Sequence, residues 1–287
     1  MRRASDVLVI GDALLDVAVA PESEPRPGAD VPAAVRATPG GQGANIAVRL
    51  VRRGVPVRLA CALGEDVAGR IVRYALAEEG VLLEATRTGG TGVVVILVGS
   101  DGERTMFSRR IPLLPLTLDA AADWAVVSGY VLLEDGELRL TDRGRLAVVG
   151  CALPERAAAQ WWPRVDALRP DLVIMNADEA RAVGADATAL AREAGALVVV
   201  TDADGVQAGF ADPDVPVRRI AVEAVRAVDT TGAGDAFAAA LITELRDASW
   251  PPTPAALDGA LSAASAFAAH VAGVPGAQAR VSGEAPA

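Results

Sequence analysis

The sequence predicts an α/β fold in which helices cover both faces of a mostly parallel sheet. Short, uninterrupted apolar runs such as Val7-Leu8-Val9-Ile10 recur along the chain, as expected for strands that are buried on both faces. Helical patterns separate these runs, and this alternation is typical of parallel strands joined by right-handed crossovers. With 287 residues, of which 52% are hydrophobic, the chain is long enough to form one such domain.

The first half of the chain follows a β-α-β-α order and then breaks into a hairpin. We expect a strand at 6–11, a helix at 43–53, a strand at 57–63 and a helix at 67–78. Residues 21–39 carry five prolines and several charges, which is too irregular for a core element. The apolar run at 92–99, the turn Ser100-Asp101-Gly102-Glu103 and the strand at 104–108 predict a hairpin. The segments near 16–39 and 88–110 are therefore expected to form a small β lid on a single domain spanning 1–287.

The second half continues the alternation. Core strands are expected at 124–128, 146–149, 171–175 and 196–201, separated by helical segments. Residues 206–210 and 217–222 read as a β pair, and Ala-rich helices are expected at 234–247 and 254–271. The tail after Gly276 is small and polar, so we expect it to be loosely held.

The composition argues against several classes of function. The formal charge of −10 and the pI of about 4.7 disfavour a duplex nucleic-acid binder, which needs a basic face. Cys61 and Cys151 have no metal-ligand spacing and His270 is the single histidine, so zinc chemistry and Ser/His/Asp hydrolysis are disfavoured. We find no apolar run near the ~20 residues that span a bilayer. Reduced core cysteines are typical of cytosolic proteins, and we expect a cytoplasmic protein without a membrane partner.

The most informative stretch is Asp229-Thr230-Thr231-Gly232-Ala233-Gly234-Asp235-Ala236-Phe237, where a loop becomes a helix. Backbone N–H groups at a helix N-terminus lack intrahelical acceptors and attract anions, and small residues keep that approach open. A carboxylate at this place is costly unless it takes a proton from an alcohol that attacks the phosphate. Alternatively, Asp235 only favours the first helical turn, as acidic residues often do. Its setting among small residues favours the general base.

A second glycine-rich loop, Gly40-Gly41-Gln42-Gly43-Ala44-Asn45, also enters a helix. A dinucleotide fingerprint would need a third glycine where Ile46 stands, and residues 21–39 separate the loop from the first strand. A Walker loop would need a lysine, and none lies near either loop. Further polar residues follow predicted strands at Asp12, Asp16, 176–179 and 201–205, so they would line the carboxyl edge of the sheet.

Together these motifs resemble the PfkB, or ribokinase-like, carbohydrate kinases. The first family signature resembles Gly40-Gly41-Gln42-Gly43-Ala44-Asn45-Ile46-Ala47 with Gly54 and Gly64, and the second resembles the stretch from Asp229 through Ile242. Gly11 to Asp16 is similar to the opening G-x-x-x-x-D of the family, and Asn176-Ala177-Asp178-Glu179 to its N-x-x-E motif. The resemblance covers nearly the whole chain and implies a three-layer α/β/α fold of the ribokinase type with a small β lid.

The resemblance also implies roles for individual residues. The acceptor hydroxyls would bind to Asp16, the Gly40 and Gly41 backbone and Asn45. Asp235 would be the general base, beside an anion hole formed by the amides of Gly232, Ala233, Gly234 and Asp235. ATP would contact Asn176, Thr201, Gly205, Gly232 and Gly234, while Glu179 with Asn176 would organise Mg²⁺, partly through water. Asp229 and Thr231 are the residues that would offer oxygens to a monovalent cation such as K⁺.

Some positions depart from the family pattern. The loop Thr201-Asp202-Ala203-Asp204-Gly205 is a residue shorter than the usual T-x-G-x-x-G and leaves the donor preference open. Gly150-Cys151-Ala152 stands where many relatives carry Asp-Pro, and Gln42 replaces the lysine common in ribose kinases. Ribose is therefore not the default acceptor.

The sequence thus predicts an ATP- and Mg²⁺-dependent kinase of a small sugar or sugar-like molecule, with a nucleoside as the alternative acceptor. A catalytically silent sugar- or nucleotide-binding regulator of the same fold is a further alternative, although a binder has no need of a base beside the phosphate. A nicotinamide-dependent oxidoreductase is disfavoured by the incomplete fingerprint. The Val- and Ile-rich lid strands expose edges that a second copy could cover, so we expect a homodimer through the lid.

Overall fold

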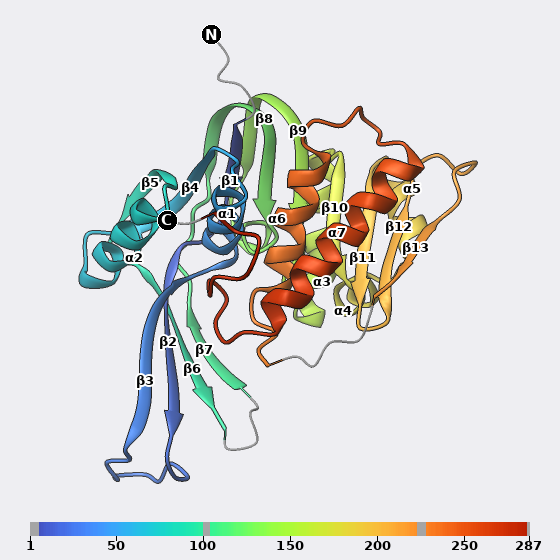
Figure 1. Cartoon of the computed structure of the whole chain (residues 1–287). Coiled ribbons are helices and arrows are strands. Elements are labelled where there is room, and N and C mark those ends of the chain that lie inside the picture. Colours follow the sequence, from blue (N-terminus) through green and yellow to red (C-terminus); the bar gives the residue numbers. More distant parts are fainter. Residues whose placement is uncertain (1–5, 100–103, 223–227, 286–287) are drawn as a thin grey trace.

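In the computed structural model, which describes residues 6–99, 104–222 and 228–285, nine strands form one large sheet (Figure 1). Their order is β13-β12-β11-β10-β9-β8-β1-β4-β5, and every neighbouring pair from β11 to β5 is parallel. The strands are β1 (Val7–Ile10), β4 (Val57–Gly64), β5 (Leu82–Thr88), β8 (Leu116–Ser128), β9 (Leu138–Val149), β10 (Leu172–Asn176), β11 (Leu197–Asp202), β12 (Gly205–Gly209) and β13 (Arg218–Ala221).

Helices cover both faces of this sheet and create two separate cores. Alternate residues of β1 enter opposite cores: Val7 and Val9 face one, Leu8 and Ile10 the other. The first core is shared with α1 (Gln42–Arg52), α2 (Val67–Glu78), α6 (Ala233–Leu245) and α7 (Pro254–Ala272). The second is shared with α3 (Glu155–Ala167), α4 (Ala177–Val183) and α5 (Ala187–Ala194). The predicted three-layer α/β/α arrangement with a mostly parallel sheet is confirmed.

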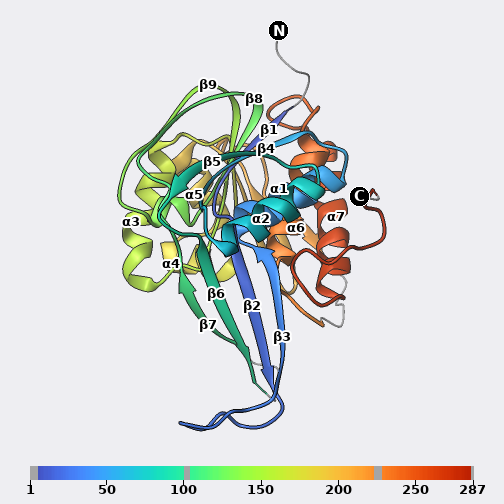
Figure 2. The ribbon, with the colours of Figure 1, turned by 90° about the vertical axis from the view of Figure 1, so that its left-hand side faces the viewer.

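A second sheet projects from the body of the molecule, as Figures 1 and 2 show. Among the described residues it has four strands in the order β3-β2-β6-β7, and we call it the lid sheet. The strands are β2 (Leu14–Pro21), β3 (Ala33–Gly40), β6 (Gly92–Val98) and β7 (Arg104–Arg109). It is built from the two segments that the sequence assigns to a lid, while the expected turn at 100–103 lies outside the described residues.

Some elements differ from the sequence-based expectation. Between the strands expected at 124–128 and 146–149 the structure has a short 3₁₀ turn, Val131–Leu133, where we expected a helical segment. Instead both strands extend toward their N-terminal ends, where β8 alternates between exposed and buried residues and so lacks an apolar run. Helix α7 is long and apolar enough to meet a length-and-composition criterion for a membrane span. It packs on α6 as a core helix, with Leu257, Leu261 and Val271 fully buried.

The expectation of a loosely held tail after Gly276 is wrong. Arg49 of α1 forms a salt bridge with Glu284 at 2.7 Å, and both side chains are 1% exposed or less. Arg52 binds the Gln278 carbonyl at 2.8 Å and pairs with Glu79 at 2.6 Å. A buried ion pair of this kind is costly to break because it leaves an unpaired charge behind, so residues 277–284, here named the C-terminal segment, are fixed on α1.

Candidate active site

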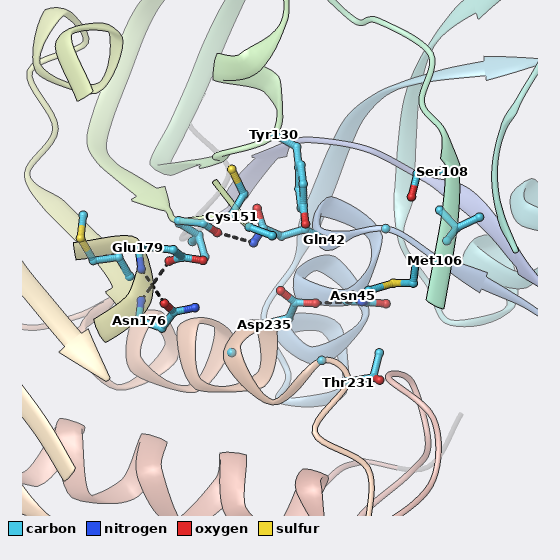
Figure 3. A pocket seen from close by; sticks show the side chains of 18 of the residues that line it. Gln42, Asn45, Met106, Ser108, Tyr130, Cys151, Asn176, Glu179, Thr231 and Asp235 are labelled. Carbon is cyan, nitrogen blue, oxygen red and sulfur yellow. Dashed lines mark hydrogen bonds between the residues drawn. The ribbon is translucent and has the colours of Figure 1, made fainter. Parts of the chain in front are cut away.

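Polar residues from several strand ends converge at the carboxyl edge of the large sheet, where open α/β sheets bind ligands. They line a cavity of about 340 Å³ between this edge and the lid sheet (Figure 3). A second cavity of about 760 Å³ adjoins the first, because Asp16, Ile96 and Thr231 line both. The predicted residues that line the first cavity are Asp16, Gly41, Asn45, Asn176, Glu179, Thr201, Thr231, Gly232, Gly234 and Asp235.

Two helices begin at this cavity, and in each the N-cap residue is a glycine. Helix α6 begins after Gly232, whose backbone is left-handed (φ 78°), and no side chain caps it. A Cβ on Gly234 would meet nothing within 4 Å, so the approach to the first-turn amides is open. Helix α1 begins after Gly41 (φ 98°), which has no side chain to cap it, but its Gly43 and Ala44 amides donate to Asp12. Uncapped amides at a helix N-terminus form an anion site, and α6 offers one beside Asp235.

Asp235 lies in the first turn of α6 and faces α1. Its Oδ2 accepts a hydrogen bond from Asn45 Nδ2 at 2.8 Å (Figure 3). Burial raises the pKa of Asp235 to about 7; the Asn45 hydrogen bond opposes this rise and the Asp12 carboxylate adds to it. A carboxylate with a pKa near neutrality matches what a general base requires.

Asn45 uses both ends of its side-chain amide within the protein. While its Nδ2 donates to Asp235, its Oδ1 accepts from Gln278 Nε2 at 2.9 Å. Asn45 is 6% exposed. Asn45 therefore has a role that the motif did not indicate, the contact with Asp235. The binding of an acceptor hydroxyl by Asn45 stays a prediction.

Asp16 stands on β2 of the lid sheet and is packed against the first glycine loop. A Cβ on Gly40 would lie 2.0 Å from Asp16 Oδ2, so this glycine leaves room for the carboxylate. Burial and the nearby Asp12 raise the pKa of Asp16 to about 6, while Arg110 lowers it. Asp12 pairs with Arg110 and accepts from the Gly43 amide at 3.3 Å, and the Arg110 guanidinium lies 3.6 Å from the centre of the Tyr130 ring.

Asn176 and Glu179 form a capping box at the start of α4. Asn176 Oδ1 accepts from the Glu179 amide at 2.8 Å, and Glu179 Oε2 accepts from the Asn176 amide at 2.9 Å. Burial, with a further contribution from Asp235, raises the pKa of Glu179 to about 7. A buried carboxyl at the cavity wall gains a favourable partner when a cation is present, so this residue fits Mg²⁺. Because Mg²⁺ keeps several waters and binds substrate phosphates, one protein carboxylate is enough to hold it.

The predicted monovalent-cation residues are occupied by N–H donors. Asp229 Oδ1 accepts from the Thr231 amide at 2.8 Å and forms a salt bridge with Arg104 at 2.9 Å. Asp229 Oδ2 accepts from the Gly276 amide at 2.8 Å, and Arg104 also binds the Thr231 hydroxyl. The guanidinium thus stands where a cation would neutralise the Asp229 carboxylate.

The remaining predicted residues do not line the first cavity. Gly40 lies beneath Asp16, Ala233 follows the cap of α6, and Asp229 lines the second cavity. Gly205 starts β12 and pairs with Asp202 and Ala221. Sequence reasoning gave no site role to these lining residues: Gln42, Met106, Arg110, Tyr130 and Cys151. Gln42 could have been found, because it stands inside the glycine signature; the others follow strands or lie on the lid without a motif.

Comparison with known proteins decides the family. Residues 4–282 match the family model described as pfkB family carbohydrate kinase. The chain belongs to the PfkB family. A fructokinase of Klebsiella pneumoniae is 29% identical to this PfkB protein over 282 residues, covering 88% of each chain. The crystal structure of a fructokinase with bound ATP from Xylella fastidiosa superposes with a TM-score of 0.75 at 23% identity, covering 95% of this chain and 94% of the other.

The fold is also similar to that of a solved nucleoside kinase. An adenosine kinase from Sinorhizobium meliloti has a TM-score of 0.75 at 20% identity and covers 98% of this PfkB chain and 97% of its own. The ribokinase-type fold expected from the sequence is thus confirmed, as is the assignment to the carbohydrate kinases, which are phosphotransferases with an alcohol acceptor. Membership of this ATP-using family also supports a small-molecule acceptor.

Proposed function

We propose that this PfkB kinase transfers the γ-phosphate of ATP to a hydroxyl of a small, neutral sugar or sugar-like acceptor, with Asp235 as the general base. The observation that carries this proposal is the position of Asp235. It is a carboxylate with a pKa of about 7, three residues into a helix whose N-terminus is uncapped and open to the cavity. The anion hole and the base thus belong to the same helical turn.

The proposed transfer is an in-line displacement. The acceptor oxygen forms a bond to the γ-phosphorus while the bond from that phosphorus to the bridging oxygen of ADP breaks, and ADP leaves with the electron pair. The acceptor proton passes to Asp235, whose Oδ2 is held by Asn45, and we assign the proton to Oδ1. The first-turn amides of α6, Gly232 to Asp235, stabilise the charge on the transferring group.

We infer that the nucleotide lies along the edge formed by β10, β11 and the start of α6. Asn176, Thr201 and Gly232 line the cavity there. Glu179 would hold Mg²⁺, mainly through water, and the metal would supply neutralisation of phosphate charge. Gly205 stays a predicted nucleotide contact, supported by its place in the loop after β11.

The charge of the first cavity favours a neutral acceptor. Asp16, Glu179 and Asp235 all line it, whereas the lining arginine, Arg110, is already paired with Asp12. A carboxylate or phosphate on the acceptor would meet like charges, which is unfavourable in a partly buried site. Asp16 and the Gly41 backbone remain the proposed contacts for the acceptor hydroxyls.

A nucleoside remains the second candidate because part of the cavity wall is apolar. Val94, Ile96 and Met106 of the lid sheet line the cavity, and such a wall can pack on the flat face of a base.

We infer that the lid sheet also forms a homodimer. By strand register, Val95, Leu97, Phe107 and Val19 share the face of the lid sheet that points away from the first cavity. Phe107 is 61% exposed and Val95 37%, and an exposed apolar face is a common interaction surface. Sedimentation should give a dimer that Phe107→Glu converts to a monomer; a monomeric wild type would contradict this inference.

Location and cation use are also proposals. Two free, buried cysteines support a reducing compartment such as the cytoplasm, and the acidic charge of −10 supports the absence of a nucleic-acid partner. K⁺ binding at Asp229 and Thr231 would require Arg104 to leave. We therefore expect turnover to be the same, within about twofold, in K⁺ and in a bulky organic cation, and to become K⁺-stimulated in Arg104→Ala.

The proposed function is tested by ADP release from ATP and Mg²⁺ across a panel of neutral sugars, nucleosides, sugar acids and sugar phosphates. We expect turnover with a neutral acceptor and its loss in Asp235→Asn. Turnover retained in Asp235→Asn would exclude the base assignment. If ATP binds but no acceptor on the panel is phosphorylated, the silent-regulator alternative gains support.

A further inference from the structure

One face of α1 holds the C-terminal segment. Asn45, Arg49 and Arg52 stand four and three residues apart, which places them on the same side of the helix. Each contacts the segment: Arg49 Nη2 binds the Ala277 carbonyl at 2.8 Å, Arg52 Nη1 binds the Gln278 carbonyl at 2.8 Å, and Asn45 binds the Gln278 side chain. The backbone carbonyl groups of Ala277 and Gln278 are therefore held in place, and the Gln278 side chain points to Asn45.

Gln278 is the outer member of a chain of three side chains that ends at Asp235. Its Nε2 donates to Asn45 Oδ1 at 2.9 Å, and Asn45 Nδ2 donates to Asp235 Oδ2 at 2.8 Å. An amide has one end that donates and one that accepts. When Gln278 donates to Asn45 Oδ1, only the NH₂ end of Asn45 can face the carboxylate.

We propose that Gln278 is a positioning residue that orients the Asn45 amide so that its NH₂ group, and not its oxygen, faces Asp235. This inference rests on the proposed function, because it concerns the residue assigned there as the base. Without the Gln278 donor, the Asn45 amide could turn over. Its oxygen would then face Asp235, which is tolerable only if Asp235 is protonated and donates in return.

The consequence is a bias toward the ionised, proton-accepting form of Asp235. The charged groups that act on Asp235 come from three other elements: Asp12 after β1, Arg49 on α1 and Glu179 on α4. Asp12 and Glu179 are acidic and favour the protonated form, as burial does, whereas the Asn45 hydrogen bond, the Gln42 side chain and Arg49 favour the charged form. Loss of the orienting contact should therefore raise the pKa of Asp235.

Two variants of Gln278 separate orientation from shape. Gln278→Met keeps the length of the side chain and removes the donor. Gln278→Glu also keeps the length, but its carboxylate can only accept and would draw the Asn45 NH₂ group away from Asp235. For Gln278→Met we expect the acid limb of the pH profile of kcat/KM for the acceptor to move up by about one pH unit. Gln278→Glu should move it further. Activity should be recovered in both variants at high pH.

The matched controls are Gln160→Met and Gln160→Glu on the exposed face of α3, which should leave the acid limb unchanged. A merely structural role for Gln278 predicts a loss that is equal at all pH values, together with a lower melting temperature. Acid limbs of both Gln278 variants that coincide with the wild type would overturn the proposal. If Gln278→Glu does not fold, Gln278→Met decides.

A second readout does not depend on the base assignment. The carboxyl of Asp235 can be titrated by ¹³C NMR in protein labelled at aspartate, with its signal identified by its loss in Asp235→Asn. The titration midpoint should rise in the order wild type, Gln278→Met, Gln278→Glu. An unchanged midpoint would refute the role of Gln278, whereas a shifted midpoint with an active Asp235→Asn enzyme would refute only the proposed function.

Discussion

Glu179 and Asp235 occupy the same position on two different helices. Each is the third residue after an N-cap, Asn176 for α4 and Gly232 for α6. The longer Glu179 folds back and accepts the amide of its own N-cap, which in turn caps the Glu179 amide. Asp235 reaches across to Asn45 of α1 instead. Burial raises the pKa of both carboxyls to about 7.

The difference lies in the N-cap. An asparagine satisfies a first-turn amide with its own side chain, so the N-terminus of α4 is closed to an anion. A glycine has no side chain to offer, so the amides of α6 stay open. The same carboxylate position therefore stabilises one helix and is left available for chemistry in the other.

The sharpest test of this comparison exchanges the two carboxylates for amides. Asp235→Asn removes the proposed base, and we expect kcat to fall about 10³-fold. Glu179→Gln leaves the base intact and should mainly raise the Mg²⁺ concentration needed for half-maximal turnover, with kcat at saturating Mg²⁺ within about tenfold of wild type. Steady-state ADP release measures both. Equal losses in the two variants would remove the distinction drawn here.

The pH dependence separates the same two groups. A base must be unprotonated, and the pKa of Asp235 is raised to about 7. We therefore expect kcat/KM for the acceptor to fall about tenfold per pH unit below 7 and to level off above it. In Glu179→Gln the limb should remain, because Asp235 causes it, and should move slightly to lower pH, because the variant removes an acidic group that favours protonated Asp235. A limb that disappears in this variant would assign the titration to Glu179.

Filling the open N-terminus of α6 should affect ATP binding more than stability. Gly234→Ala places a methyl group where a Cβ meets nothing within 4 Å, in the path of a phosphate. We expect KM for ATP to rise about tenfold, while unfolding in urea shows equal or slightly greater stability, since alanine favours helix by up to about 1 kcal/mol over glycine. Asp178→Ala, at the equivalent position of α4, is the control and should leave KM unchanged.

The smallest effect is expected at the closed N-terminus. Asn176→Ala removes the capping side chain of α4, which should lower the free energy of unfolding by about 1 kcal/mol. Urea denaturation measures this change. No loss of stability would mean that the capping box does not contribute as its geometry suggests.

Much of the fold could be predicted because central parallel strands are apolar along their whole length. The run Val7 to Ile10 and the segment Trp124 to Ser128 are buried throughout, so they stand out in the sequence. The N-terminal half of β8 could not be found in this way, since its residues alternate in exposure. Strand β5 could not be found either, because it lies at the edge of the sheet, where none of its residues is fully buried.

The candidate site was predictable where chemistry requires a local pattern. The two glycine loops and Asp235 follow from spacing alone, because a helix N-terminus and its small residues are neighbours in sequence. The C-terminal segment was not predictable, since its partners on α1 are more than 220 residues away. Gln278 and Glu284 stand among small residues. Their roles follow from their contacts with α1, which no local sequence pattern indicates.

The order in which the chain is synthesised gives the C-terminal segment one more consequence. Both glycine loops and Asp235 leave the ribosome before residue 277 does, yet Arg49 lacks its buried partner Glu284, and Asn45 lacks Gln278, until the C-terminal segment arrives. A nascent chain that has reached residue 275 holds every family motif and an unpaired arginine in α1. The last residues to be synthesised therefore complete both the ion pairing of α1 and the surroundings of the base, so we expect a chain that lacks them to be less stable and to hold Asn45 less firmly.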